Sequence, residues 1–267
     1  MRFSANLGFL WAGLPLPAAI RAAKAAGFHA VECHWPFDQP ASEVKEALAE
    51  TGLPLLGLNT RRGNVGDGEN GLAALPGREA AARAAIDEAL DYARATDCGA
   101  VHVMAGHSDE PRTRATYCAN LAYACDAAAR DGRTILIEPL NRYDAPGYFL
   151  TTTSQAAEII GEVGAPNLRL MFDCYHVQIM EGDVSRRLET LLPLIGHIQF
   201  ASVPDRGTPD HGELDYGHIF SHIEALGYAR PLGAEYKPKG DTLASLGWLA
   251  ATRNLQLKEA ERNQDHV

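Results

Sequence analysis

Short apolar segments alternate with alanine-rich helical segments along the whole chain, and this alternation limits the fold more than any other feature. The apolar segments lack the regular polar positions of half-exposed strands, as ILIEPL at residues 135–140 shows. Such segments are typical of parallel strands that are buried on both faces. The expected strands cover residues 3–8, 30–35, 54–60, 100–106, 134–140, 168–173, 195–202 and 231–237.

Helical segments separate these strands and end at the glycine or proline that stops a helix. Because crossovers between parallel strands are right-handed, eight such units can close into an α/β fold of the (β/α)8 TIM barrel type. A doubly wound open sheet is the alternative, but the chain reads NLGFLWAG after the first strand and lacks its glycine fingerprint. We predict a single barrel domain over residues 1–267, with helices at 17–26, 41–50, 78–96, 112–130, 154–163, 184–192 and 216–226.

Composition narrows the classes of function. The net charge is −10 and no run of basic residues stands out, which disfavours a protein that neutralises phosphates of a nucleic acid. No stretch approaches the ~20 apolar residues of a membrane helix. The five cysteines form no CxxC pair, so a reducing compartment and a cytoplasmic location are expected. A barrel of this size commonly self-associates, but the sequence leaves the oligomeric state open.

Four consecutive strands end in a polar residue that apolar packing does not explain: Glu138, Asp173, Gln199 and Glu235. In such barrels the carboxyl ends of the strands carry the chemistry. Three carboxylates that converge there repel one another unless a cation neutralises them. Oxygen ligands without cysteine favour Mg²⁺ or Mn²⁺ over Zn²⁺. We therefore predict a divalent-metal site, with a structural carboxylate network as the alternative.

Several segments resemble the hydroxypyruvate isomerase family of the xylose-isomerase-like barrels. They are EPLNRYDAPGY at 138–148, FDCYHVQIMEGD at 172–183, IGHIQFASVPDR at 195–206 and GAEYKP at 233–238. The resemblance spans nearly the whole chain. It implies that the four strand-end residues bind the metal and that Glu138 and Glu235 also form the proton-transfer pair.

The same resemblance implies that His176 and Arg206 hold substrate oxygens and that Asp144 touches the substrate. The guanidinium fork of Arg206 also matches a substrate carboxylate on chemical grounds. The chain departs from the family pattern after Arg206, where it reads Gly207-Thr208-Pro209 instead of His-Glu-Pro. This departure bears on the identity of the substrate more than on the type of reaction.

The expected reaction converts hydroxypyruvate to tartronate semialdehyde through a cis-enediolate, with the two glutamates as acid and base. An isomerase of another short 2-oxo acid, such as a 2-oxotetronate, is the first alternative. A ketose 3-epimerase is disfavoured because such enzymes commonly have histidine in place of Gln199. An apurinic endonuclease is disfavoured by the charge, and a non-catalytic binding protein by the two intact glutamates. The glycine-rich loop at 61–76 follows the third strand and is interpreted as a lid, with a mobile insertion as the alternative.

Overall fold

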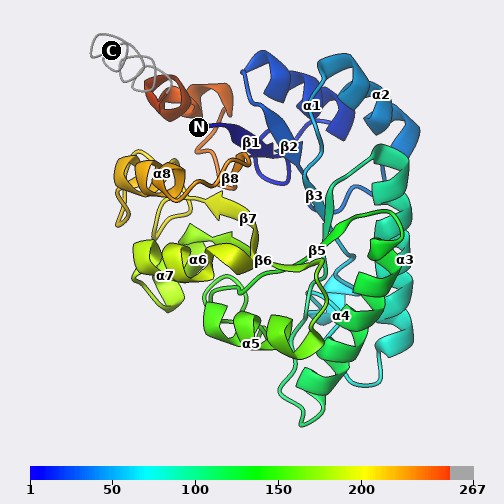
Figure 1. Ribbon diagram of the computed structural model, residues 1–267. Coiled ribbons are helices and arrows are strands. Elements are labelled where there is room, and N and C mark those ends of the chain that lie inside the picture. The colour runs from blue at the N-terminus through cyan, green and yellow to red at the C-terminus, as the bar shows by residue number, and fades with distance from the viewer. Residues whose placement is uncertain (253–267) are drawn as a thin grey trace.

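Eight parallel strands form the centre of the computed structural model, which describes residues 1–252 (Figure 1). The predicted single domain over residues 1–267 therefore ends in residues 253–267, which lie outside the described part of the chain. The strands are β1 (Phe3–Asn6), β2 (Ala30–Glu32), β3 (Gly57–Asn59), β4 (Ala100–His102), β5 (Thr134–Ile137), β6 (Leu168–Asp173), β7 (Ile195–Phe200) and β8 (Leu232–Ala234).

Each strand pairs with its sequence neighbour, and the sheet closes on itself. The hydrogen-bonded order runs β2-β1-β8-β7-β6-β5-β4-β3. Between β2 and β3, the Leu56 amide donates to the Val31 carbonyl at 2.8 Å, and the Val31 amide donates to the Pro54 carbonyl at 3.0 Å. These bonds complete the ring, and the predicted TIM barrel is confirmed.

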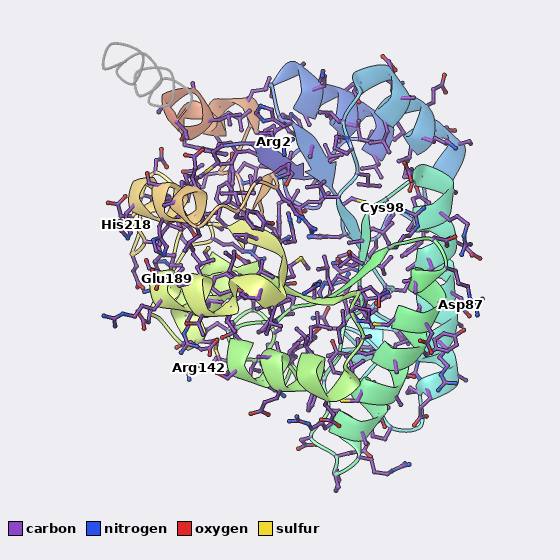
Figure 2. The ribbon with its side chains drawn as sticks, viewed as in Figure 1. Arg2, Asp87, Cys98, Arg142, Glu189 and His218 are labelled. Atoms are coloured by element: carbon purple, nitrogen blue, oxygen red, sulfur yellow. The ribbon has the colours of Figure 1, made fainter. Side chains whose placement is uncertain are left out.

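Helices surround the barrel because each has one apolar face that packs against the outside of the sheet. Asp87 and Glu189, labelled in Figure 2, point outward from this ring of helices. No helix within residues 1–252 is long and apolar enough to cross a bilayer. The helices are α1 (Leu16–Ala25), α2 (Ala41–Thr51), α3 (Glu79–Thr96), α4 (Thr113–Ala129), α5 (Thr153–Val163), α6 (Cys174–Met180), α7 (Val184–Leu191) and α8 (Tyr216–Ala225).

Alternation along the strands fills the barrel interior. Successive side chains point to opposite faces of a strand, so Leu136 and Met171 point inward below Glu138 and Asp173. With Ala100, these two residues form a small apolar layer inside the barrel, separate from the main core between sheet and helices. On β5 and β6, the polar residues at the strand ends therefore lie above an apolar layer.

Two expectations about elements differ from the structure. Most strands are shorter than predicted, because the apolar pattern continues into buried loops beyond the last paired residue. Helix α6 was not predicted. Its sequence CYHVQIM begins directly at the end of a buried strand, and the Asp173 side chain caps it by accepting from the Tyr175 amide at 2.9 Å.

Candidate active site

The four predicted strand-end residues lie at neighbouring positions of the barrel mouth. Asp173 ends β6 and is the register partner of Gln199 on β7, while Glu138 and Glu235 directly follow β5 and β8. All four side chains are buried, with exposed fractions from 1% to 5%. The fold thus brings three carboxylates and one amide to one end of a water-poor interior.

Several ligand atoms in this group make no hydrogen bond within the described residues. They are Oε1 of Glu138, Oδ2 of Asp173 and Oε1 of Gln199, and each is buried. A buried oxygen without a partner costs about 1–3 kcal/mol, so native proteins seldom leave several together. A cation is the group that unpartnered oxygens of this kind would bind, and the residues therefore fit the expected divalent metal.

The pKa values of the buried carboxyls also indicate that the site suits a divalent cation. Burial, with the nearby charges of Glu235 and Asp173, raises the pKa of Glu138 well above its ordinary value. Burial and the Glu235 charge likewise raise the pKa of Asp173 to about 8. Arg206 is the cation that contacts this group, so one positive charge faces three carboxyls. A divalent cation would supply the missing charge and keep the carboxyls ionised.

Glu235 is the most firmly held of the four. Its Oε1 accepts from Nδ2 of Asn6 at 2.8 Å and lies 3.0 Å from Nε2 of His34, and its Oε2 accepts from Arg206 at 2.8 Å. Burial raises its pKa, but Arg206 and His34 outweigh this effect and hold the pKa at about 2. Glu235 is therefore ionised at neutral pH, and its pKa is shifted in the opposite direction to that of Glu138.

Sequence reasoning assigned no role to Asn6 and His34. They lie at the carboxyl ends of β1 and β2, where a polar residue after an apolar strand was the available signal. His102, at the end of β4, carries the same signal. Its Nδ1 lies 3.6 Å from Oε2 of Glu138, and burial lowers its pKa to about 3. The mouth therefore has polar residues around most of its ring.

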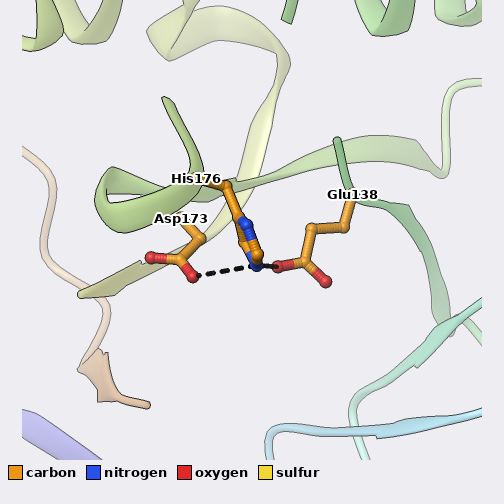
Figure 3. A group of neighbouring side chains, drawn as sticks. All are labelled: Glu138, Asp173 and His176. Carbon is orange, nitrogen blue, oxygen red and sulfur yellow. Dashed lines mark ion pairs between the residues drawn. The ribbon is translucent and has the colours of Figure 1, made fainter. Parts of the chain in front are cut away.

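His176 lies among the carboxylates, as Figure 3 shows. Its Nε2 is 3.6 Å from Oδ2 of Asp173 and 3.8 Å from Oε1 of Glu138, and the ligand atoms of the three residues all lie within 4.8 Å. Its other nitrogen, Nδ1, accepts from the backbone amide of Asn141 at 3.0 Å. Burial and the charge of Arg206 lower its pKa to about 3, so the ring is neutral.

These contacts decide what His176 can do. A backbone amide can only donate, so the proton of the neutral ring sits on Nε2. Nε2 is then a hydrogen-bond donor aimed at the carboxylates and has no lone pair for a metal. The geometry therefore favours contact with a substrate oxygen, as predicted, over a place in the metal's ligand set.

Arg206 is buried at the mouth, with 11% of its side chain exposed. It lies between the rings of Phe9 and Tyr175, at 4.8 and 4.9 Å from their centroids. One terminal nitrogen binds Glu235 and the other donates to Oδ2 of Asp144 at 3.2 Å, while Nε has no partner within the described residues. The structure thus brings Arg206 and Asp144 together beside the carboxylates, with one guanidinium donor unused.

Residues 207 and 208, where the sequence departs from the family pattern, make contacts within their own loop. The Gly207 amide donates to Asp205, and the Thr208 hydroxyl donates to Asp210 at 2.5 Å. An ion pair between His211 and Asp205 at 3.0 Å closes the same loop. The departure therefore lies in a loop that follows Arg206 directly and is held by its own polar contacts.

Comparison with known proteins identifies one family, and two similar proteins are named as isomerases. A family model described as the xylose isomerase-like TIM barrel matches residues 20–252. A 2-oxo-tetronate isomerase of Cupriavidus necator is 47% identical over 93% of this chain and 97% of that protein. A Homo sapiens protein named "Putative hydroxypyruvate isomerase" is 42% identical over 93% of this chain and 94% of that protein.

A solved structure shows the same fold at similar identity. It is described as an AP endonuclease, family 2, from Brucella melitensis, and it is 40% identical with a TM-score of 0.90. The match covers 94% of this chain and 98% of that chain. The similarity therefore extends over the whole barrel.

Proposed function

This chain belongs to the xylose isomerase-like TIM barrel family and is an isomerase, and from this premise we propose that it interconverts hydroxypyruvate and tartronate semialdehyde (2-hydroxy-3-oxopropanoate). The observation that carries the proposal is the group of unpartnered, buried oxygens at adjacent strand ends, with a neutral histidine donor beside it. Carboxylates for moving a proton and a donor for a developing oxyanion are what such an isomerisation needs.

Glu138, Asp173 and Gln199, each with an oxygen that has no partner among residues 1–252, would hold the metal together with Glu235, whose oxygens contact Asn6, His34 and Arg206. Mg²⁺ or Mn²⁺ suits these oxygen ligands. When bound, the cation would supply Lewis-acid polarisation of the substrate ketone and so acidify the neighbouring C–H bond. With that charge bound, the three carboxyls would stay ionised, and Glu138 could accept a proton.

The proton transfers balance as follows. A glutamate takes a proton from C3 of hydroxypyruvate while the C2 oxygen gains one, which forms the enediol. The C3 hydroxyl then gives up its proton and C2 receives one, which forms the aldehyde. We assign the proton transfer at C3 to Glu138, because its Oε1 has no hydrogen-bond partner among residues 1–252, whereas both oxygens of Glu235 are held by Asn6, His34 and Arg206. Glu235, fixed by Asn6 and Arg206, is the second member of the pair.

His176 and Arg206 would bind the substrate. The Nε2 proton of His176 would stabilise negative charge on the C2 oxygen, and the neutral ring with Nδ1 occupied by the Asn141 amide supports this role. The free Nε of Arg206 offers a donor to the substrate carboxylate, and Asp144 competes for the same guanidinium. Because Asp144 already binds this guanidinium, a substrate would need a negative charge of its own to compete with Asp144 for Arg206.

Deuterium exchange tests the proposal directly. The protein is incubated with hydroxypyruvate in D₂O, with Mn²⁺ or with a chelator, and deuterium entry is followed by NMR. We expect deuterium at C2 of tartronate semialdehyde with Mn²⁺, and none with the chelator. Glu138→Gln and Glu235→Gln should each abolish turnover, whereas Glu158→Gln, an exposed carboxylate on α5, should not. Absence of product and exchange with Mn²⁺ present would overturn the proposal.

A 2-oxotetronate is the second candidate substrate, because the Cupriavidus necator relative is named for it. It shares with hydroxypyruvate the carboxylate and the adjacent ketone. Parallel assays with the two compounds separate these candidates by kcat/KM. We propose a small-molecule substrate and not a nucleic acid, despite the description of the Brucella melitensis structure, because a net charge of −10 repels phosphates.

A further inference from the structure

Glu32 is a buried carboxylate that the proposed reaction does not use. It ends β2 with 3% of its surface exposed, and its Oε2 lies 2.6 Å from Nε2 of His197 and 3.3 Å from Nε2 of Gln199. We propose that Glu32 is a positioning residue that turns the Gln199 amide so that its oxygen faces the metal site. The inference rests on the proposed function, because it requires that Gln199 binds a metal.

The side-chain amide of Gln199 can bind a cation only through its oxygen end. The oxygen and nitrogen of glutamine have nearly the same shape, so hydrogen-bond partners decide which end points where. Oε2 of Glu32 is the acceptor beside Gln199, and it receives the NH₂ end of the amide at 3.3 Å. The oxygen is then left buried and without a partner within the described residues, which is the state that a metal ligand needs. With the amide reversed, the NH₂ group would face the cation and repel it.

His197 holds Glu32 in this role. It lies two residues before Gln199 on β7, so both side chains point into the barrel and reach the same carboxylate oxygen. The 2.6 Å contact is short and ties the Glu32 carboxyl group to β7. One strand therefore supplies both the donor that anchors Glu32 and the amide that Glu32 orients.

Gly233 on β8 supplies the space for this arrangement. A Cβ at this position would lie 2.2 Å from Oε1 of Glu32, 2.8 Å from Cγ of Gln199 and 2.9 Å from Nε2 of His197. The backbone of Gly233 lies outside the left-handed region that favours glycine. The missing side chain thus makes room for the three residues, and any side chain at 233 would displace them.

Mn²⁺ affinity of the full-length protein, measured by isothermal titration calorimetry, tests the inference. Residues that orient metal ligands contribute about 10–100-fold to metal affinity. Glu32→Met keeps the size of the side chain but removes its acceptor, and we expect binding to weaken by about this factor. Glu32→Gln keeps one acceptor oxygen and should stay close to the wild type. Ser4→Ala, which loses only a 3.4 Å contact to Oε1 of Glu32, is the control and should bind normally.

Gly233→Ala tests the same point with the carboxylate still present, should Glu32→Met fail to fold. We expect it to weaken Mn²⁺ binding while its melting temperature shows a folded protein. Wild-type affinity in Glu32→Met or in folded Gly233→Ala would overturn the inference. Equal weakening in Glu32→Gln and Glu32→Met would overturn it as well, because Glu32 would then act through its charge. If the wild type binds no Mn²⁺, the proposed function fails and the inference fails with it.

Discussion

Hydrogen bonds around single side chains determine which of them can bind a cation and which can donate a proton. His176 and Asp173 lie 3.6 Å apart, yet their partners give them different roles. Nδ1 of His176 accepts from the Asn141 amide, so Nε2 must donate. Within residues 1–252, Oδ2 of Asp173 has no hydrogen-bond partner, so this oxygen is available to a cation.

Substitution of these two residues separates their roles. Asp173→Asn keeps the cap of α6, because asparagine also accepts from the Tyr175 amide, but it removes the charge. We expect it to lower Mn²⁺ affinity by more than about tenfold. His176→Gln should retain Mn²⁺ affinity and lose turnover. Calorimetry on both variants checks this, and loss of Mn²⁺ binding in His176→Gln would show that His176 is a ligand.

The sequence was sufficient to place four oxygen-bearing side chains at adjacent strand ends, because strand ends are a local property. The hydrogen bonds that hold these side chains could not be predicted, since they join residues far apart in the chain. Asn6 and Glu235 are separated by 229 positions, and Glu32 and His197 by 165. These residues meet only when the barrel closes, and their spacing along the sequence does not predict the contacts.

Among the elements, the loop at 61–76 is fixed to the barrel more firmly than its composition indicates. It contains the short helix η1 (Val65–Asp67), and Arg61 binds Glu88 on α3 at 2.7 Å. Gly71 pairs with Ala105 beyond β4, and the guanidinium of Arg62 stacks on Trp35 at 4.0 Å. These contacts anchor both sides of the loop, and its action as a lid remains a prediction.

Gly71 is the position where this loop depends most on a missing side chain. Its φ is +116°, and a Cβ there would lie 2.7 Å from the Met104 carbonyl oxygen. Gly71→Ala should therefore destabilise the protein through both backbone strain and a steric clash. Gly68→Ala is the matched control, with a φ of +82° but open space around it, and should cost only about 1–2 kcal/mol. Urea unfolding measures both, and an equal cost would show that Gly71 is not an anchor.

The pattern of short buried strands and amphipathic helices made the elements predictable, since periodicity reports burial directly. Helix α6 escaped prediction because its apolar residues continue the pattern of β6 without a break. Its start depends on the Asp173 side chain, which a sequence pattern does not distinguish from a further strand residue. The sequence pattern thus distinguishes a helix from a strand where one face of the element is exposed. It does not distinguish them where all faces are buried.

At the scale of the whole molecule, the buried carboxyls link stability to pH and to metal. Asp173 has a pKa of about 8 in the folded protein, against an ordinary value of 3.8, and the pKa of Glu138 is raised in the same direction. The folded, metal-free protein therefore holds these protons more tightly than the unfolded chain does. The stability contributed by Asp173 is full below pH 3.8 and is lost as pH rises toward about 8.

Metal binding should show the opposite dependence, because the ligands must lose these protons. We expect Mn²⁺ to raise the melting temperature more at pH 8 than at pH 6, where the cation competes with protons on Asp173 and Glu138. Thermal unfolding at both pH values, with and without Mn²⁺, checks the sign. A stabilisation that is larger at pH 6 would contradict the assignment of the buried carboxyls as ligands.

A crystal structure with Mn²⁺, located by anomalous scattering, tests the central claim most directly. We expect one strong peak at the barrel mouth, about 2.0–2.3 Å from oxygens of Glu138, Asp173, Gln199 and Glu235. In that structure Nε2 of His176 should remain outside the ligand set, and Nε2 of Gln199 should face Glu32. A peak ligated by His176 in place of Gln199, or no peak at these strand ends, would contradict the account.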